Sequence, residues 1–277
     1  MAERTTPGTR TALTIAGSDC SGGGGIQADL KTFSVMGVYG ASVVTAVAAA
    51  NSTGIKAVHI LDPDLVEQQI AAVATDLDAH AVKSGMLGNA NVIRVTATSV
   101  KRHNLFPLVV DPQIVGCNGD RLLDDSALKM LCRQVLPLAA VVTPNRLEAA
   151  LLLGASEPID DLYAARDAAR QLCSRYGPAA CIVTGIKRPN EEEGEAVDLF
   201  FDGRADQELV SAWRPTKNTR GAGSTFSAAI TAALAMGEPI EQAVQTAKQV
   251  VSEAIRQTTD LGHGPSPVNP LAYSKVS

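Results

Sequence analysis

Short apolar runs alternate with helix-period segments along most of this chain. The apolar runs predict buried strands at 12–16, 42–49, 80–83, 107–111, 139–143 and 180–184. Apolar residues at helical spacing predict helices at 27–36, 64–76, 90–103, 125–135 and 160–176, and two closing helices at 221–236 and 239–257. The segment 197–203 predicts a strand and turn, one half of a hairpin. This alternation predicts an α/β fold with a mostly parallel central sheet and helices on both faces.

The ends of the predicted strands carry glycine and polar residues. Gly17, Gly85, Asp111 and Asn145 each stand where an apolar run stops. In open parallel sheets, ligands bind at the carboxyl ends of the strands. We therefore expect the motifs around these residues to converge on one edge of the sheet.

The stretch 218–226 places two glycines directly before a predicted helix. Gly221 and Gly223 precede an amphipathic segment that begins near Ser224. Backbone N–H groups at a helix start lack intrahelical partners and carry the positive end of the helix dipole, and glycine lets a ligand approach the main chain. The stretch predicts an anion site suited to a phosphoryl group. A tight turn followed by a cap residue is the alternative interpretation.

Two further junctions have the same strand, loop and helix form. The first strand runs into the glycine-rich loop 22–25 and then into a helix that carries Asp29. Another strand ends near Val142 and leads into a helix start with oxygen-bearing side chains at Asn145 and Glu148. Together the junctions indicate an enzyme that handles phosphate.

Composition narrows the classes of function. The composition, 45% hydrophobic and 19% charged, is near that of globular proteins. A length of 277 residues fits one large α/β domain or two small ones, and we favour one domain. With a net charge of −5, the chain lacks the excess of basic residues that nucleic-acid binding requires. No apolar run approaches the roughly 20 residues that span a bilayer, and residues 1–10 lack a hydrophobic signal core. We expect a cytoplasmic protein with no nucleic-acid or membrane partner, consisting of a flexible leader (1–10), one domain (11–265) and a C-terminal tail (266–277).

Several motifs along the chain occur in an order that is specific to one family. They are Ala16–Asp19 with the glycine-rich loop through Thr32, Lys83–Gly88, Asp111–Pro112, Gly119–Leu123, Thr143–Asn145 with Glu148, Val197–Leu199, 218–229 and Gly262–Pro265. Through them nearly the whole chain resembles the hydroxymethylpyrimidine and phosphomethylpyrimidine kinases of thiamine synthesis, which belong to the ribokinase-like superfamily. Bacterial pyridoxal kinases share most of these motifs, so the resemblance is less specific for the substrate.

The resemblance implies a ribokinase-like fold and transfer of phosphate from ATP. The acceptor would be the hydroxymethyl group of 4-amino-5-hydroxymethyl-2-methylpyrimidine, its monophosphate, or both. Phosphoryl transfer requires in-line positioning and stabilisation of charge on the moving group. The amides of the catalytic turn would hold the oxygens of that group, at Gly221, Ala222, Gly223 and Ser224.

Three side chains would provide oxygen ligands for magnesium. Asp111, Asn145 and Glu148 offer the hard oxygens that Mg²⁺ prefers, directly or through water, with Asp111 and Glu148 as the metal residues. Without the resemblance, Asp111 would be a strand-end turn residue, and Asn145 and Glu148 would be a helix N-cap with a first-turn charge.

The resemblance also divides the site into two sides. On the nucleotide side, hydroxyl and amide groups would meet phosphates or ribose at Asn145, Thr184, Gly185, Thr216, Lys217 and Thr219. On the acceptor side, the substrate would contact Gly17, Asp19, Asp29, Ala50, Met86 and Gln113, with Asp29 placed to bond a ring nitrogen or exocyclic amine. Each of three residues also has a structural interpretation. Lys217 could be a solvated lysine, Asp29 could cap or form an ion pair within its own helix, and Met86 could be a core residue.

Three positions depart from the family's pattern. Ser224 stands where the family usually has cysteine, and the wider superfamily aspartate, as the base for the acceptor hydroxyl; a neutral alcohol is a poor proton acceptor near pH 7. Three interpretations of Ser224 remain open. Turnover is slow or absent, the residue was substituted to trap a complex, or the metal and the γ-phosphate carry out the proton step without a protein base. Ala50 replaces a glutamine that reads the pyrimidine edge, and Gln113 replaces valine. We expect Gln113 to supply an amide from the opposite wall.

Other functions remain open at this point. The altered Ala50 keeps a pyridoxal kinase possible, and Ser224 keeps open a non-catalytic ligand-binding protein that lost the base. A nucleotide-binding dehydrogenase is disfavoured, because the glycines at 22–25 are loosely spaced and no acidic residue ends a clear second strand. The expected partners are a small heterocyclic alcohol and ATP, and a homodimer is possible because dimers are common in the resembled family.

Overall fold

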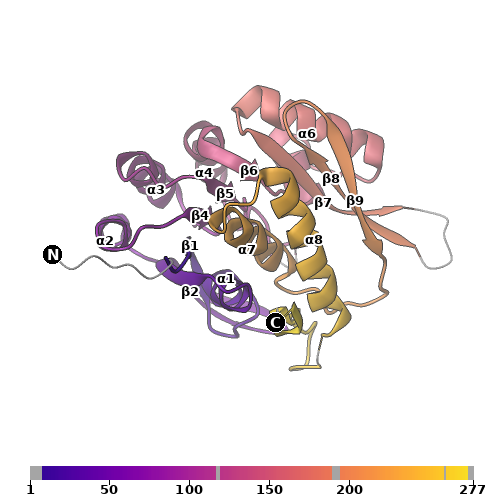
Figure 1. Ribbon diagram of the computed structural model, residues 1–277, viewed down its shortest axis with the longest axis horizontal. Coiled ribbons are helices and arrows are strands. Elements are labelled where there is room, and N and C mark those ends of the chain that lie inside the picture. The colour runs from indigo at the N-terminus through magenta and orange to yellow at the C-terminus, as the bar shows by residue number, and fades with distance from the viewer. Residues whose placement is uncertain (1–7, 117–118, 189–193, 259, 274–277) are drawn as a thin grey trace.

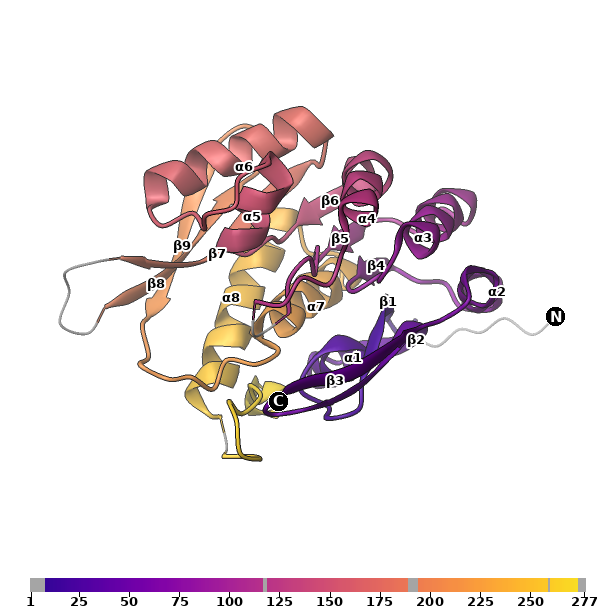
Figure 2. The same cartoon turned by 180° about the vertical axis from the view of Figure 1, so that it is seen from behind.

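The computed structural model describes residues 8–116, 119–188, 194–258 and 260–273 (Figures 1 and 2). The predicted leader and tail, 1–10 and 266–277, lie partly outside the described residues. Within these ranges, no helix combines the length and apolar character that crossing a bilayer requires.

The strands of the described chain form one nine-stranded sheet in the order β3-β2-β1-β4-β5-β6-β7-β8-β9. Neighbouring strands from β2 through β7 are parallel, while β3, β8 and β9 pair antiparallel at the two edges. This confirms the predicted mostly parallel sheet. The strands are β1 (Thr11–Asp19), β2 (Tyr39–Asn51), β3 (Gly54–Ile60), β4 (Ala81–Ser84), β5 (Leu108–Val110), β6 (Ala139–Val142), β7 (Ala180–Arg188), β8 (Glu195–Phe201) and β9 (Asp206–Ala212).

Helices cover both faces of the sheet. One face carries α1 (Gly25–Val35), α7 (Ala222–Ala235) and α8 (Ile240–Arg256), seen in front in Figure 1. The other carries α2 (Pro63–Ala74), α3 (Ala90–Arg102), α4 (Asp125–Met130), α5 (Arg146–Leu153) and α6 (Leu162–Tyr176), seen in front in Figure 2.

Two hydrophobic cores explain why the central strands read as continuous apolar runs. Val141 packs into the core beneath α1, α7 and α8, while its neighbour Val142 packs into the core on the opposite face. Val109 and Val110 divide in the same way. Successive strand residues point to opposite faces, so a strand covered by helices on both sides is apolar at most positions.

The structure differs from the sequence prediction mainly at the sheet edges. The strand β3 was not predicted, because most of its side chains are exposed and it has no apolar run. The predicted hairpin half at 197–203 corresponds to β8, which pairs with β9. The strand β9 was also not predicted, because its half-exposed side chains form no apolar run in the sequence. The helix predicted at 125–135 is α-helical only as far as Met130, and the rest of it, Leu131–Val135, is a single π-helical turn.

The strand order reverses at β1, which has β2 on one side and β4 on the other. A reversal of this kind opens a crevice at the carboxyl ends of the two strands. Helix α7 packs against β1, β4 and β5. Its first turns lie at the end of β5, since Ser227 bonds to Asp111 there. The fold therefore brings the helix start and the strand ends to one edge.

Candidate active site

The start of α7 leaves backbone amides free. Gly221 caps the helix in the left-handed region, at φ 77°, without a side-chain cap. The amide of Ala222, one of the predicted phosphate donors, donates to the Thr219 carbonyl at 3.1 Å and is therefore not free for a ligand. No described residue accepts a hydrogen bond from the amides of Gly223 or Ser224. Gly223 is exposed, and a Cβ on it would meet no atom within 4 Å. The free donors of the predicted anion site are therefore the amides of Gly223 and Ser224.

Asp111 lies beside this turn. Its Oδ2 accepts hydrogen bonds from Ser227 Oγ at 3.1 Å and from Gln113 Nε2 at 3.0 Å, and the side chain is buried. Ser227 Oγ also lies 2.8 Å from the Gly223 carbonyl oxygen, so its single proton is shared between the two acceptors, and the carboxylate is linked to the start of α7. The amide nitrogen of Gln113 thus points at Asp111. The contact of Gln113 with an acceptor stays a prediction.

Glu148 and Asn145 form a capping box at the start of α5. Asn145 Oδ1 accepts from the amides of Leu147 and Glu148 at 3.0 Å, and Glu148 Oε2 accepts from the Asn145 amide at 3.1 Å. Glu148 Oε1 also accepts from the amide of Ile114 at 2.9 Å. The structure thus contains the N-cap that was the alternative interpretation, and it orients Glu148 toward the loop after Asp111.

Asp111 and Glu148 together are a chemically suitable magnesium pair. Burial, and then the charge of Asp111, raise the pKa of Glu148 to about 7. Two buried carboxylates that disfavour each other's ionisation are stabilised by a shared cation. Across the described ranges, no cluster of three or more His, Cys, Asp or Glu residues could hold a metal ion. Mg²⁺ commonly uses only one or two carboxylates with waters and phosphate oxygens, so the pair fits this ion.

A buried lysine stands behind the pair. Lys83, at 1% exposure on β4, places Nζ 2.5 Å from Asp29 Oδ1 and 3.9 Å from Asp111 Oδ2. Thr14 Oγ1 donates to the other oxygen of Asp29 at 2.6 Å. Burial raises the pKa of Asp29, and Lys83 opposes this effect. Asp29 is fully buried, and its two oxygens are bonded to Lys83 and Thr14. Its contact with an acceptor stays a prediction.

The acceptor-side residues gather at the ends of β1, β2 and β4. A Cβ on Gly17 would lie 3.4 Å from Met86 Sδ, and Met86 is half-buried. Both backbone groups of Ala50 contact Cys20 Sγ, at 3.2 and 3.3 Å. The carboxylate of Asp19 is nearly buried and accepts from Ser21 and Arg220. These bonds fix the position of Asp19 in this wall, and its contact with the substrate stays a prediction.

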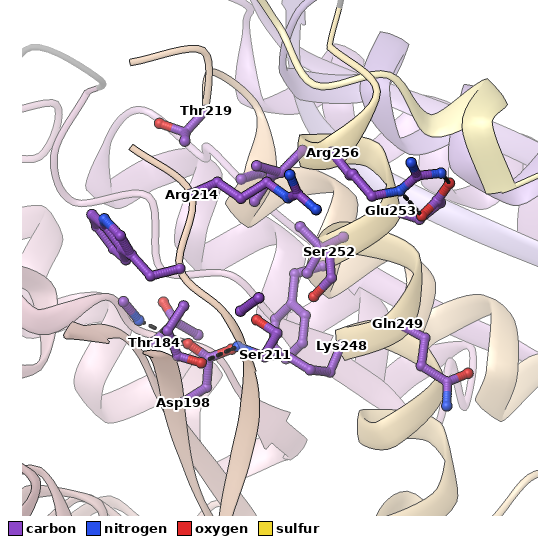
Figure 3. A pocket seen from close by; sticks show the side chains of 18 of the residues that line it. Thr184, Asp198, Ser211, Arg214, Thr219, Lys248, Gln249, Ser252, Glu253 and Arg256 are labelled. Carbon is purple, nitrogen blue, oxygen red and sulfur yellow. Dashed lines mark hydrogen bonds and ion pairs between the residues drawn. The ribbon is translucent and has the colours of Figure 1, made fainter. Parts of the chain in front are cut away.

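A cavity of about 610 Å³ opens on the nucleotide side (Figure 3). It brings together four predicted nucleotide residues and two from the anion site, namely Thr184, Gly185, Thr216, Thr219, Ala222 and Gly223. Asn145 and Lys217 do not line it, and Lys217 is exposed, as its alternative interpretation expected. The volume lies within the range of small-molecule sites. One continuous space thus connects a pocket of ligand size with the free amide of Gly223.

Sequence reasoning gave no role to several residues that line the cavity. Asp198 Oδ2 accepts from Lys248 Nζ at 2.8 Å, and its Oδ1 accepts from the Gly185 amide at 2.8 Å. Trp213 forms part of the wall, with the Lys187 ammonium 5.1 Å from its ring centre. A charged residue in the apolar run 197–201 and a lysine on the buried face of α8 were the signals that could have identified Asp198 and Lys248.

Known proteins resemble this chain over nearly all of its length. It is 44% identical to a hydroxymethylpyrimidine/phosphomethylpyrimidine kinase of Rhizobium meliloti (strain 1021), over 94% of this chain and 97% of the relative. A phosphomethylpyrimidine kinase structure from Clostridium difficile 630 superposes with a TM-score of 0.75 at 37% identity, covering 88% of this chain and 99% of that one. The pyridoxal kinase from Staphylococcus aureus, in complex with AMP-PCP and pyridoxal, gives a TM-score of 0.86 at 31% identity, covering 97% and 96%. The profile of the family described as phosphomethylpyrimidine kinase matches residues 19–269, and the chain belongs to this family.

Proposed function

We propose that this phosphotransferase uses ATP and Mg²⁺ to phosphorylate the hydroxymethyl group of 4-amino-5-hydroxymethyl-2-methylpyrimidine, its monophosphate, or both. One observation carries the proposal. The nucleotide-side cavity reaches Gly223, whose amide is free, and Asp111 is bonded to Ser227 one turn further along the same helix. A base and ribose pocket, an oxyanion turn and a carboxylate therefore meet at one place, as phosphoryl transfer requires.

The residues divide the work of positioning and charge stabilisation. ATP occupies the cavity, with its terminal phosphate at the amides of Gly223 and Ser224, which donate to oxygens that gain charge in the transition state. The acceptor lies against Gly17 and Met86. Asp111 and Glu148 are the residues that would hold Mg²⁺, which when bound neutralises charge on the phosphate oxygens.

Ser224 contributes its amide rather than a base. Its side chain is buried, and no described side chain forms a hydrogen bond with its Oγ that would activate it. An alcohol without a hydrogen-bonded base does not accept a proton near pH 7. The proton of the acceptor hydroxyl therefore passes to an oxygen of the transferred phosphate, and turnover is slower than with a protein base at this position.

The test is an acceptor panel with a matched pair of glycine variants. Mg-ATP is incubated with hydroxymethylpyrimidine, its phosphate, pyridoxal or pyridoxine, and both ADP and the phosphorylated product are measured. Gly223→Ala adds a methyl group in open space at the anion site, so it should fold normally and lower kcat by about 10²-fold. Gly8→Ala adds the same group in open space at residue 8 and should change nothing. Absence of a phosphorylated product from every acceptor would refute the proposal.

Pyridoxal phosphorylation is the second candidate. Ala50 presents no side-chain amide to an acceptor, and a solved pyridoxal kinase shares the fold at a TM-score of 0.86. Phosphorylation of pyridoxal or pyridoxine without either pyrimidine would establish this candidate instead.

The expected homodimer belongs to the same proposal. Light scattering during size-exclusion chromatography would separate the 28.8 kDa chain from a species of twice its mass. The cytoplasmic location stays a prediction from the sequence.

A further inference from the structure

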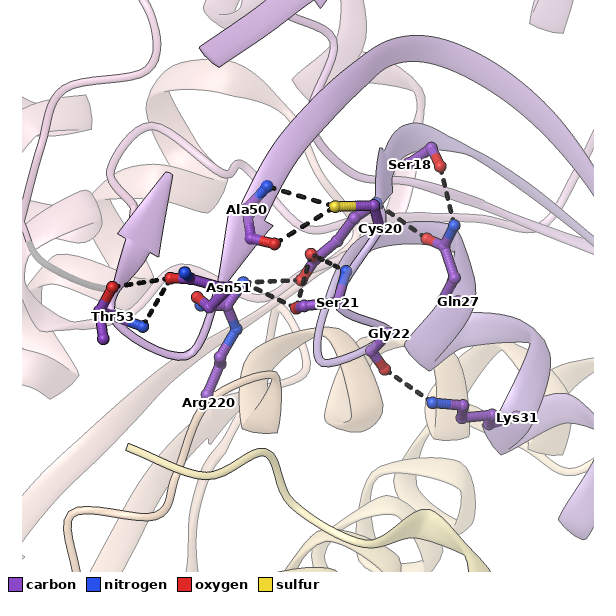
Figure 4. Close-up of polar contacts among 11 residues, drawn as sticks. Ser18, Cys20, Ser21, Gly22, Gln27, Lys31, Ala50, Asn51, Thr53 and Arg220 are labelled. Carbon is purple, nitrogen blue, oxygen red and sulfur yellow. Dashed lines mark hydrogen bonds and ion pairs between the residues drawn. The ribbon is translucent and has the colours of Figure 1, made fainter. Parts of the chain in front are cut away.

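The side chain of Arg220 joins three segments that are far apart in the sequence. It directly precedes Gly221, but it extends toward the loop after β1 and the end of β2 (Figure 4). Its Nη2 lies 2.8 Å from Asp19 Oδ2 and 3.2 Å from Ser21 Oγ, and its Nη1 donates to the Asn51 carbonyl. Only 9% of the side chain is exposed. One guanidinium thus connects the catalytic turn to β1 and β2, two of the strands of the acceptor wall.

The backbones meet at the same place. A Cβ on Gly221 would lie 1.8 Å from the Gly23 carbonyl oxygen, so neither chain segment could move closer. A Cβ on Gly23 would lie 3.0 Å from Arg220 Nε. On the other side, the Arg220 carbonyl accepts from the Val268 amide at 3.0 Å. The turn before α7 is therefore held between the glycine-rich loop and the C-terminal segment.

The ion pair has the properties of a fixed connection. Burial alone would raise the pKa of Asp19, but hydrogen bonds from Arg220 and Ser21 hold it below its ordinary value. Asp19 Oδ1 accepts from both the amide and the hydroxyl of Ser21, at 2.9 and 2.7 Å. Charge-assisted bonds from a planar guanidinium fix direction as well as distance.

From this geometry, and resting on the proposed function, we infer that Arg220 is a positioning residue that sets the separation of the acceptor from the transferred phosphate. Arg220 contacts two strands of the acceptor wall, β1 and β2, while the phosphate donors at 223–224 belong to α7. Asp19 and Arg220 are 201 positions apart, so contacts across the fold alone fix how these parts meet. A misplacement of about 1 Å in such a site costs about 10²-fold in rate.

The experiment compares Arg220→Met with a matched variant, Arg166→Met. Methionine keeps much of the aliphatic length and removes the guanidinium. Arg166 forms an ion pair with Asp206 on β9, at the opposite edge of the sheet from β2 and β3, so its loss controls for the removal of an arginine ion pair. For each variant we would measure hydrogen exchange of residues 19–25 and 221–226, kcat, the KM for ATP, and the ratio of ADP released to acceptor phosphorylated.

Arg220→Met should raise exchange in both segments, lower kcat by about 10²-fold and raise the ADP-to-product ratio above one, with little change in the KM for ATP. Water then replaces the misplaced acceptor hydroxyl and ATP yields ADP and phosphate. Arg220→Lys, which keeps the charge but loses the planar fork, should fall between the wild type and Arg220→Met. Arg166→Met should match the wild type in all four measurements.

In an active enzyme, two results would overturn the inference. One is unchanged hydrogen exchange in Arg220→Met. The other is raised hydrogen exchange with unchanged kcat and an unchanged ADP-to-product ratio, which would make the contact merely structural. Should Arg220→Met not fold, Asp19→Asn carries the same expectations and the same refuting results, because it removes the anionic partner and leaves the arginine. A wild-type chain that phosphorylates no acceptor would instead refute the proposed function, and this inference with it.

Discussion

Replacing Lys83 by methionine should destabilise the protein strongly. The substitution keeps the side-chain length but leaves the buried carboxylate of Asp29 without its cation. At an effective dielectric constant of about 20, unit charges at 2.5 and 3.9 Å from the ammonium attract it by about 7 and 4 kcal/mol. Burial of the ammonium offsets several kcal/mol of this attraction. The expected net loss is therefore about 3–5 kcal/mol, the range for removing one partner of a buried pair.

Urea denaturation of a double-mutant cycle measures this loss. Lys83→Met, Asp29→Asn and the double variant are compared with the wild type at pH 7. The double variant should lose less than the sum of the single variants, because removing both charges leaves neither unpaired. Lys129→Met, at an exposed position on α4, is the control and should stay within about 0.5 kcal/mol of the wild type.

The pH dependence gives a second check. Burial already raises the pKa of Asp29, and loss of Lys83 should raise it further. A carboxyl whose pKa is raised on folding costs stability as the pH rises through that pKa, so the deficit of Lys83→Met should shrink from pH 7 to pH 5. A deficit below about 1 kcal/mol at pH 7, or one that does not change with pH, would refute the buried-pair reasoning.

Three further predictions concern the catalytic turn and the carboxylates. Ser224→Cys should raise kcat by about 10²-fold, at the low end of general-base effects, and equal rates would remove the missing-base argument. In metal-free buffer, the free energy of unfolding of the wild type should fall as the pH rises from about 4.5 toward 7, because folding raises the pKa of Glu148 to about 7. Glu148→Gln should lack this fall, and an identical pH dependence of melting in the two proteins would contradict the assignment. Gly221→Ala should destabilise by more than about 1 kcal/mol, since its φ is 77° and its Cβ would meet Gly23, whereas Gly223→Ala should melt with the wild type; equal melting of both alanine variants would refute the close contact.

Local sequence was sufficient for the central sheet and for the free amides at the start of α7. The apolar runs that became β1, β4, β5, β6 and β7 needed no knowledge of distant residues, because strands buried on both faces are apolar at most positions. The free amides at Gly223 and Ser224 follow from the helix start itself. Edge strands such as β3 escaped prediction, because a strand with one solvated face carries a weaker pattern.

Only the tertiary structure decided what the charged residues contact. The family resemblance placed Asp29 and Asp19 on the acceptor side, and the fold pairs them with Lys83 and Arg220, which lie 54 and 201 positions away. The sequence determined which segments form strands, helices and an amide-lined turn, since these depend on neighbours within a few residues. The partner of a buried charge depends on which strands and helices become adjacent, and that is set by the packing of the whole chain.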